Sequence, residues 1–237
     1  MSTEPLAVDA SGVCRRYGRR WALVDVSLQV PRGTVVMLTG RNGSGKSTLL
    51  RVIATAIRAD RGSVRVLGHD TRARREDVRR SVALLGHHSY LYEALTPLDN
   101  LNIAARFLWP PGGGPSPRAL LQEVGLAERA EDPVSTFSAG MRKRLSLART
   151  LLQDAPVVLL DEPYGQLDPP GFRMVDGLLG RLRDSGRTVL MATHLLERGG
   201  AICDQAVVLE QGRLVWSGPA AQVPEASASA VPGVAPR

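Results

Sequence analysis

One glycine-rich segment, residues 40–47, constrains this chain of 237 residues more than any other feature of its sequence. It reads Gly40-Arg41-Asn42-Gly43-Ser44-Gly45-Lys46-Ser47 and matches the pattern G-x-x-x-x-G-K-[ST]. A short β-branched strand is predicted before it, over residues 34–39, and an amphipathic helix after it, over residues 46–56. Inward-turned backbone N–H groups and the positive end of the helix favour phosphate at this place. Given both flanks, we interpret the segment as a phosphate loop and set aside a solvated glycine turn.

The groups of this phosphate loop have separate expected tasks. Lys46 is expected to reach the β and γ phosphates of a nucleotide as a point charge, and the Ser47 hydroxyl to ligate Mg²⁺. Thr48 is expected to assist at the start of the helix. The whole predicted phosphate-binding set is Gly40, Asn42, Gly43, Ser44, Gly45, Lys46, Ser47 and Thr48.

A second motif places two carboxylates at the end of an apolar run, Val157-Val158-Leu159-Leu160-Asp161-Glu162. A core strand avoids such charges unless a cation or hydrogen bonds meet them. Asp161 is the expected Mg²⁺ partner of Ser47, and Glu162 is placed to orient and deprotonate a water for attack on the γ-phosphate. The alternative is a strand that ends in ordinary surface acids, and it loses weight once the phosphate loop is accepted.

Strands and helices alternate along the chain, which predicts an α/β fold with a mainly parallel sheet covered on both faces. A helical block, about residues 90–153, interrupts this pattern, so one domain with an inserted block is expected over residues 1–218. Residues 219–237 are rich in Pro, Ala and Ser and predict a flexible tail. The predicted strands are 26–30, 34–39, 63–67, 82–85, 157–160, 188–192, 206–209 and 214–216, and the predicted helices are 46–56, 72–80, 119–124, 139–152 and 171–182.

Composition excludes several classes of protein. Hydrophobic residues make up 43% of the chain, which argues against global disorder. Cys14 and Cys203 fit no metal or redox spacing, so we expect free thiols. The sequence offers neither an apolar run long enough for a membrane helix nor a secretory signal. The net charge of +7 suits phosphates, nucleic acid or an anionic membrane face alike.

A third motif, Phe137-Ser138-Ala139-Gly140-Met141, resembles the signature of the ATP-binding-cassette (ABC) ATPases. With the two nucleotide motifs, the resemblance covers about residues 6–218. It implies a P-loop NTPase fold in which a small antiparallel β part and an inserted α-helical subdomain join a mainly parallel sheet. It also implies ATP and Mg²⁺ as ligands, ATP hydrolysis as the activity, and a homodimer. In such a dimer Ser138 and Gly140 would contact the γ-phosphate of the ATP that the partner binds.

The resemblance implies roles for four more residues. Tyr17 resembles the aromatic residue that stacks on adenine, and its alternative is a partly buried surface tyrosine. Asp168 resembles the loop residue that couples the two sites of a dimer, a role compatible with an N-cap before Pro169. His194 resembles the switch histidine that bonds the γ-phosphate. His88 stands where the family usually has a glutamine near Mg²⁺ and the water, and its imidazole can still offer a nitrogen lone pair.

The amino-acid sequences of segments 86–88, 95–101, 161–164 and 192–197 resemble those of the haem-exporter ATPases of cytochrome c biogenesis, the CcmA subfamily. This implies hydrophobic permease subunits as partners and a peripheral position on the cytoplasmic face of the inner membrane. The alternatives are an ATPase of another exporter, for a drug, polysaccharide or lipid, and a soluble ABC ATPase that acts on ribosomes or DNA. We expect no direct nucleic-acid contact, because that last class typically carries two cassettes or a long coiled-coil insertion.

Overall fold

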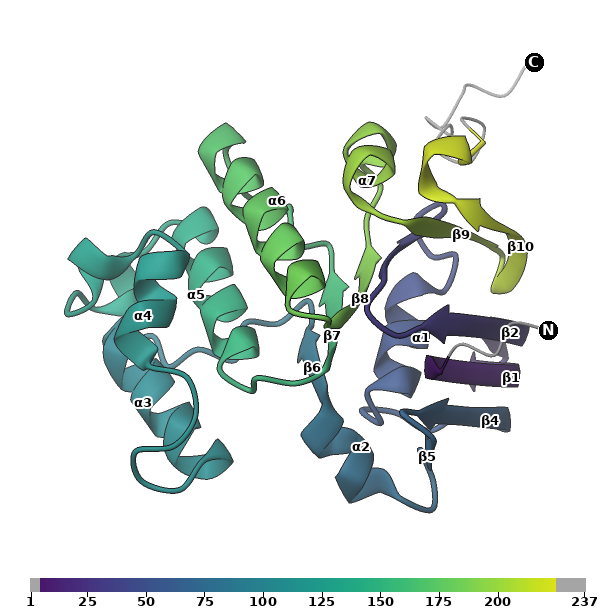
Figure 1. The fold of residues 1–237 in the computed structure, drawn as a ribbon, viewed down its shortest axis with the longest axis horizontal. Coiled ribbons are helices and arrows are strands. Elements are labelled where there is room, and N and C mark those ends of the chain that lie inside the picture. The colour runs from purple at the N-terminus through teal and green to yellow at the C-terminus, as the bar shows by residue number, and fades with distance from the viewer. Residues whose placement is uncertain (1–4, 225–237) are drawn as a thin grey trace.

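The computed structural model describes residues 5–224, which form two β-sheets and the helices around them (Figure 1). The central sheet has the strand order β10-β9-β3-β8-β7-β6. Five of its strands run parallel, and β10 runs antiparallel to β9 at one edge. Its strands are β3 (Val35–Thr39), β6 (Val82–Leu85), β7 (Val157–Asp161), β8 (Thr188–Ala192), β9 (Gln205–Glu210) and β10 (Arg213–Pro219). The predicted α/β fold with a mainly parallel sheet is confirmed.

A second, antiparallel sheet has the order β2-β1-β4-β5. Its strands are β1 (Leu6–Tyr17), β2 (Arg20–Pro31), β4 (Arg61–Val66) and β5 (His69–Asp70). The sequence analysis missed β1 and shortened β2 to residues 26–30. Register shifts between Ala10 and Val13, and again between Val13 and Arg15, interrupt the period-two alternation by which a strand is recognised.

Helix α1 (Lys46–Ile53) lies between the two sheets. Its buried Leu49, Leu50 and Ile53 share one hydrophobic core with strands of both sheets, so the segment after the phosphate loop is fixed on two sides. The helix ends before residue 56, where it was predicted to end, because Thr55 adopts a left-handed backbone with φ 58°. Helix α2 (Arg75–Ser81) follows a turn in which the Asp70 carboxylate accepts backbone N–H bonds.

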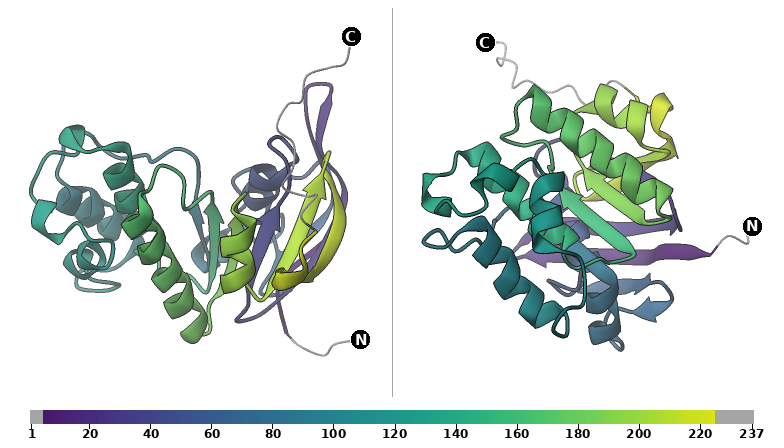
Figure 2. Two further views of the ribbon diagram at one scale, coloured as in Figure 1. Left: turned by 90° about the horizontal axis from the view of Figure 1, so that it is seen from above. Right: turned by 60° about the vertical axis from the view of Figure 1, so that its left-hand side comes forward.

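The opposite face of the central sheet is covered by α6 (Pro169–Asp184), α7 (Leu196–Ile202) and a lobe of helices that stands beside the sheet (Figure 2). The lobe contains α3 (Pro97–Leu108), α4 (Pro117–Glu123) and α5 (Ala139–Leu151), with short 3-10 turns η1 (Ala127–Arg129) and η2 (Val134–Thr136). The hydroxyls of Thr96, Ser116 and Ser138 cap its three α-helices. We call these helices the helical lobe. They fall within the block predicted from the sequence.

The carboxyl-terminal segment differs from its prediction at one boundary. Strand β10 runs on to Pro219, and a 3-10 turn η3 (Ala220–Gln222) follows, with Ala220 buried against the core. A tail that starts at residue 219 is therefore placed too early, since packing holds Ala220 in the domain. Residues 225–237 of the predicted tail lie outside the described residues.

Candidate functional site

The phosphate loop connects the end of β3 to the start of α1. Gly40, Gly43 and Gly45 have φ angles of 132°, 77° and 112°, which side chains resist. At Gly40 a side chain is also excluded sterically, because a Cβ atom would lie 2.0 Å from the carbonyl oxygen of Leu209 in β9. The loop is thus pressed against the edge of the central sheet, and its curl needs glycine.

Two polar side chains of the loop are buried. The Lys46 ammonium donates hydrogen bonds to the carbonyl oxygens of Gly40 at 2.7 Å and Arg41 at 3.2 Å. Burial lowers the pKa of Lys46, against the opposing charges of Glu162 and Asp161. The Ser44 hydroxyl is also buried and has no hydrogen-bond partner within residues 5–224. A buried hydroxyl of this kind suits a phosphate oxygen of a bound nucleotide.

The structure brings the two predicted Mg²⁺ ligands together. The Ser47 hydroxyl donates to Asp161 Oδ1 at 3.0 Å, although the two residues are 114 positions apart. Asp161 is the last residue of β7, which lies one strand away from β3 in the sheet, with β8 between them. The carboxyl ends of these parallel strands share one edge, where ligands bind in α/β folds.

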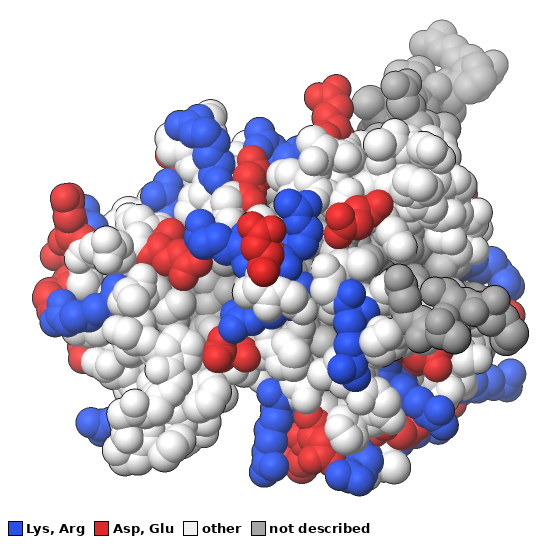
Figure 3. Space-filling model, in the orientation of Figure 1, with Lys and Arg blue, Asp and Glu red and all other residues white. Residues whose placement is uncertain are grey.

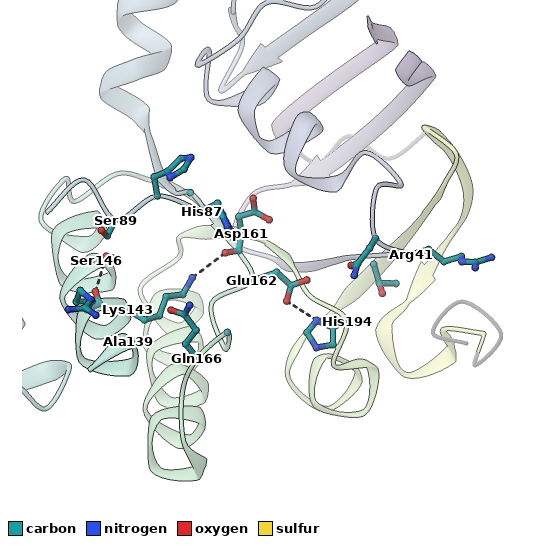
Figure 4. Close-up of a pocket in the computed structure, with 17 residues that line it drawn as sticks. Arg41, His87, Ser89, Ala139, Lys143, Ser146, Asp161, Glu162, Gln166 and His194 are labelled. Atoms are coloured by element: carbon teal, nitrogen blue, oxygen red, sulfur yellow. Dashed lines mark hydrogen bonds and ion pairs between the residues drawn. The ribbon is translucent and has the colours of Figure 1, made fainter. Parts of the chain in front are cut away.

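Glu162 follows Asp161 in a strained backbone conformation with φ 48°. Its N–H donates to the carbonyl of Ala192 at 2.9 Å, and its Oε2 lies 3.0 Å from His194 Nδ1 (Figure 4). A carboxylate only accepts, so the imidazole nitrogen is the donor of this bond. Glu162 and His194, which the sequence predicts as catalytic, therefore form one hydrogen-bonded pair.

A hollow of about 1030 Å³ opens in front of these groups, and we call it the large hollow. One wall is the core wall, made by the phosphate loop, and the facing wall comes from α5 and the loop after β6. Asp161, Glu162 and His194 lie between them (Figure 4). The facing wall includes Gly86, His87, His88, Ala139, Arg142 and Lys143.

Lys143 is a site residue that the sequence analysis did not single out. Its ammonium donates to the carbonyl oxygen of Asp161 at 3.3 Å (Figure 4). Burial lowers the pKa of Lys143, while Asp161 and Glu162 act in the opposite direction. Lys143 lies in the basic run of residues 142–144, and helix periodicity alone does not show that the middle residue turns inward.

A smaller hollow of about 340 Å³ extends from the phosphate loop to Tyr17; it shares Asp161 and Glu162 with the large hollow, and its other lining residues include Arg20, Ser44, Lys46, Ser47 and Thr48. Tyr17 is 46% exposed, and the Arg15 guanidinium lies 5.0 Å from its ring centroid. One face of the ring is thus occupied by a cation. The position suits an adenine ring beside a phosphate group in the loop.

His88 lies exposed on the rim of the large hollow. Its ring meets His87 edge-on at 5.7 Å and Tyr90 at 5.8 Å between centroids. It lines the same hollow as Asp161 and Glu162, where a residue that replaces the family's glutamine is expected to lie. Its catalytic role stays a prediction.

Three other predicted residues lie apart from the phosphate loop of this chain. Ser138 is the N-cap of α5 and accepts the N–H of Met141 at 3.2 Å. Gly140 packs closely on the next loop, since a Cβ there would lie 2.9 Å from the carbonyl of Gln166. Asp168 caps α6 and pairs with Arg144 at 2.9 Å, and the Gly171 N–H followed by Arg144 lowers its pKa. None of the three lines the two hollows.

These features define a class of protein: a nucleotide-binding P-loop fold with a helical lobe whose helix α5 faces the phosphate loop across the large hollow. A family profile described as ABC transporter matches residues 23–165. The chain belongs to the ABC transporter family, and it is the ATP-hydrolysing kind of subunit.

Relatives and solved structures agree with this membership. The chain is 34% identical over 221 residues to the daunorubicin/doxorubicin resistance ATP-binding protein DrrA of Streptomyces peucetius, covering 92% of this chain and 67% of that protein. It is 33% identical over 219 residues to the Nod factor export ATP-binding protein I of Ralstonia nicotianae, covering 92% and 68%. A solved ATP-binding subunit of an ABC transporter superposes with a TM-score of 0.78 at 28% identity over 90% of each chain. A dimeric cassette bound to ADP and Pi, at 24% identity and a TM-score of 0.81 over 90% and 98%, shares the fold.

Proposed function

We propose that this chain hydrolyses Mg²⁺-bound ATP at the phosphate loop, where Asp161 and Glu162 line both hollows, with Glu162 as general base, and that hydrolysis drives an export transporter. The observation that carries the proposal is the contact between Ser47 and Asp161 at 3.0 Å, next to the strained Glu162. Two oxygen ligands from distant parts of the chain meet there, and a carboxylate follows at the next position.

The donor set fits Mg²⁺. A hydroxyl and one carboxylate are hard oxygen ligands, and Mg²⁺ is usually held by one or two carboxylates plus phosphates and waters. Within residues 5–224 there is no cluster of three or more His, Cys, Asp or Glu side chains that could hold a metal alone, so phosphate and water would complete the shell. Bound between Ser47 and Asp161, the ion would supply charge neutralisation at the β and γ phosphate oxygens.

The remaining work falls to side chains. Lys46 and Ser44 would bind phosphate oxygens, and Tyr17 would stack on adenine. Glu162 would accept a proton from the attacking water, and the His194 Nδ1–H bond would hold its second oxygen still. His194 lines the large hollow beside Glu162, so its predicted role as the switch histidine that bonds the γ-phosphate is compatible with this pair.

The metal dependence of ATP hydrolysis tests this site. We predict that Asp161→Asn and Ser47→Ala each raise the Mg²⁺ concentration for half-maximal activity by about tenfold or more. Loss of a residue that only supports a metal ligand typically lowers metal affinity by about 10-fold to 100-fold, and loss of a direct ligand should lower it at least as much. Steady-state hydrolysis measured over a Mg²⁺ titration gives the value. Asp184→Asn, at the exposed end of α6, is the matched control. An unchanged Mg²⁺ requirement in both variants would remove these two residues from the metal site.

A homodimer is part of the proposal. Ser138 and Gly140 border the N-terminus of α5, away from the phosphate loop of their own chain. A helix N-terminus favours an anion. A second copy could present its bound γ-phosphate to this helix end, with Asp168 near the contact between copies.

A permease partner is supported by a groove of about 820 Å³ that continues from the large hollow along the helical lobe. Gly86, His87 and His88 line both. Tyr90 and Phe107 line the groove and are 72% and 87% exposed. We propose an apolar helix of a membrane permease subunit as its occupant, which would hold this chain at the cytoplasmic membrane face. No helix within residues 5–224 is itself long and apolar enough to cross a membrane.

Two cargo classes follow from different observations. Relatives named for daunorubicin/doxorubicin resistance and Nod factor export favour a drug-like or lipid-like molecule. The second candidate is haem for cytochrome c biogenesis. It is favoured by the resemblance of segments such as residues 86–88 and 161–164 to the haem-exporter ATPases. A deletion strain tested for covalent haem and for drug susceptibility separates them. Lost haem staining would support haem, and normal staining with raised drug sensitivity would support the first class.

A function on nucleic acid finds less support on the surface. Basic side chains are interspersed with acidic ones on the face shown in Figure 3 rather than gathered in one tract. Several arginines are engaged in ion pairs, such as Arg15 with Asp60 and Arg118 with Glu131. Binding to DNA or RNA through so mixed a surface would weaken steeply with salt.

A further inference from the structure

Lys143 differs from Arg144, the next residue on α5, in the partner of its side chain. Arg144 pairs with the exposed Asp168 at 2.9 Å, near the surface. The Lys143 ammonium instead enters the large hollow and donates to the carbonyl oxygen of Asp161 at 3.3 Å (Figure 4). A lysine ammonium is strongly hydrated, and exchanging part of that hydration for one backbone carbonyl costs free energy. The placement of Lys143 therefore needs an explanation.

The carbonyl that Lys143 binds lacks a strand partner on that side. In a trans peptide unit the N–H and C=O groups point in opposite directions. The Glu162 N–H points to β8, where it donates to Ala192 at 2.9 Å. The Asp161 carbonyl therefore points toward β6, whose pairing with β7 ends one residue earlier, at Leu85 and Leu160. Lys143 takes the place of the donor that β6 no longer offers.

This peptide unit sets the direction of Glu162. With φ 48°, Glu162 turns sharply out of the strand, and its carboxylate meets His194 in the large hollow. Such a backbone persists only where the surroundings hold it. Here the preceding peptide is held at both ends, by Ala192 on one side and by Lys143 on the other.

Charge gives the same arrangement a second support. Lys46 lines the smaller hollow and Lys143 the facing wall of the large hollow, and the charge of each lysine interacts with both Asp161 and Glu162. Two ammonium groups and two carboxylates balance in a confined space, which limits the cost of burying any of them. Lys46 belongs to the phosphate loop, whereas Lys143 belongs to the helical lobe.

We propose that Lys143 is a positioning residue for hydrolysis: its bond to the Asp161 carbonyl fixes the Glu162 carboxylate and ties α5 to the catalytic strand. This inference rests on the proposed role of Glu162 as general base. Because the tie runs from α5 to the peptide before Glu162, a displacement of α5 would release that peptide and misdirect the base.

The test compares kcat and KM for ATP in Lys143→Met, Lys143→Arg and Glu162→Gln. Lys143→Met keeps the length of the side chain and removes its donors, and it should lower kcat by about 10-fold to 100-fold, the range for loss of a charged hydrogen bond. KM should stay within about threefold, because Lys143 does not hold the phosphates. Lys143→Arg retains donors and should restore kcat to within about threefold of wild type. Arg118→Gln, in an exposed ion pair of the same lobe, is the control and should change neither value.

The outcomes separate this inference from the proposal beneath it. If Glu162→Gln abolishes turnover while Lys143→Met keeps wild-type kcat, the role of Lys143 is wrong and the base stands. If Lys143→Met raises KM with kcat unchanged, Lys143 binds ground-state nucleotide and the inference is also wrong. If Glu162→Gln still turns over, both assignments are wrong. Should Lys143→Met fail to fold, Lys143→Gln replaces it with the same expected fall in kcat, since its amide is too short to reach the carbonyl.

Discussion

The two walls of the large hollow are built in different ways. The core wall, the phosphate loop, is fixed between β3 and α1 and presses its glycine backbone on β9. The facing wall, made by α5 and the loop after β6, packs into the same hydrophobic core as the central sheet, and side chains of residues 143–153 also bind backbone carbonyls. Arg149 reaches Ser89 and Tyr90, Gln153 reaches Arg79 and Val82, and Lys143 reaches Asp161.

This difference indicates what each wall can do. A loop enclosed by two packed elements has one conformation, and added atoms have no room. The helical lobe shares a hydrophobic core with the central sheet but has no loop confined in this way, and its side-chain bonds to the backbone each contribute only about 1 kcal/mol. The core wall is therefore suited to recognise phosphate, and the helical lobe is suited to move relative to it. Two substitutions test whether the walls are separate in this sense.

The largest expected effect falls on the core wall. Gly40→Ala should lower the free energy of unfolding by about 4 kcal/mol, from the strain of φ 132° and from a Cβ forced to 2.0 Å of the Leu209 carbonyl oxygen. The same shift of the loop should weaken ATP binding at least about tenfold. Urea unfolding and equilibrium ATP binding measure the two effects.

Gly180→Ala is the matched control for that variant. A Cβ at Gly180, within α6, meets open space, so alanine should leave stability unchanged or raise it by about 0.5–1 kcal/mol. If Gly40→Ala behaves like Gly180→Ala, the loop is not confined as described.

A smaller effect is expected in the helical lobe. Leu121→Ala on α4 removes a fully buried side chain and should cost about 3 kcal/mol of unfolding free energy. ATP affinity should change by less than about threefold, because α4 does not line the phosphate loop. The same two measurements apply, and Leu108→Ala, at a 42% exposed position of α3, should cost about 0.5 kcal/mol.

The comparison between the walls would fail in a recognisable way. A loss of ATP affinity in Leu121→Ala as large as in Gly40→Ala would show that the lobe and the loop respond as one unit. If the two variants lose the same unfolding free energy but only Gly40→Ala loses ATP affinity, the distinction becomes stronger. Both parts of the molecule would then be weakened, and only the core wall would carry the phosphate site.

The core wall could be predicted from the sequence because local residue identity decides it. Glycines and a lysine between a strand and a helix specify a curled loop, and the apolar strand before Asp161 places its carboxylate at the same sheet edge as Ser47. The contact between these two residues follows once both strands are assigned to one parallel sheet.

The remaining features depend on packing that spacing does not show. Lys143 lies in a basic run, and only the packing of α5 beside β7 brings it to the Asp161 carbonyl while Arg144 pairs with Asp168. Helix α7 was missed because it contains Gly199 and Gly200, which read as a helix breaker. At Gly199 the missing side chain serves packing, since a Cβ would lie 2.1 Å from the sulfur of Met37.

Hydrolysis by Glu162→Gln, measured beside ATP binding, tests the central claim most directly. The amide keeps the shape of the side chain and cannot accept the proton of the attacking water. If Glu162 is the general base, steady-state turnover falls by about 100-fold or more, the typical contribution of such a base, while ATP affinity stays within about threefold. Turnover at the wild-type rate would contradict the claim, because the strained residue beside Asp161 would then have no part in the reaction.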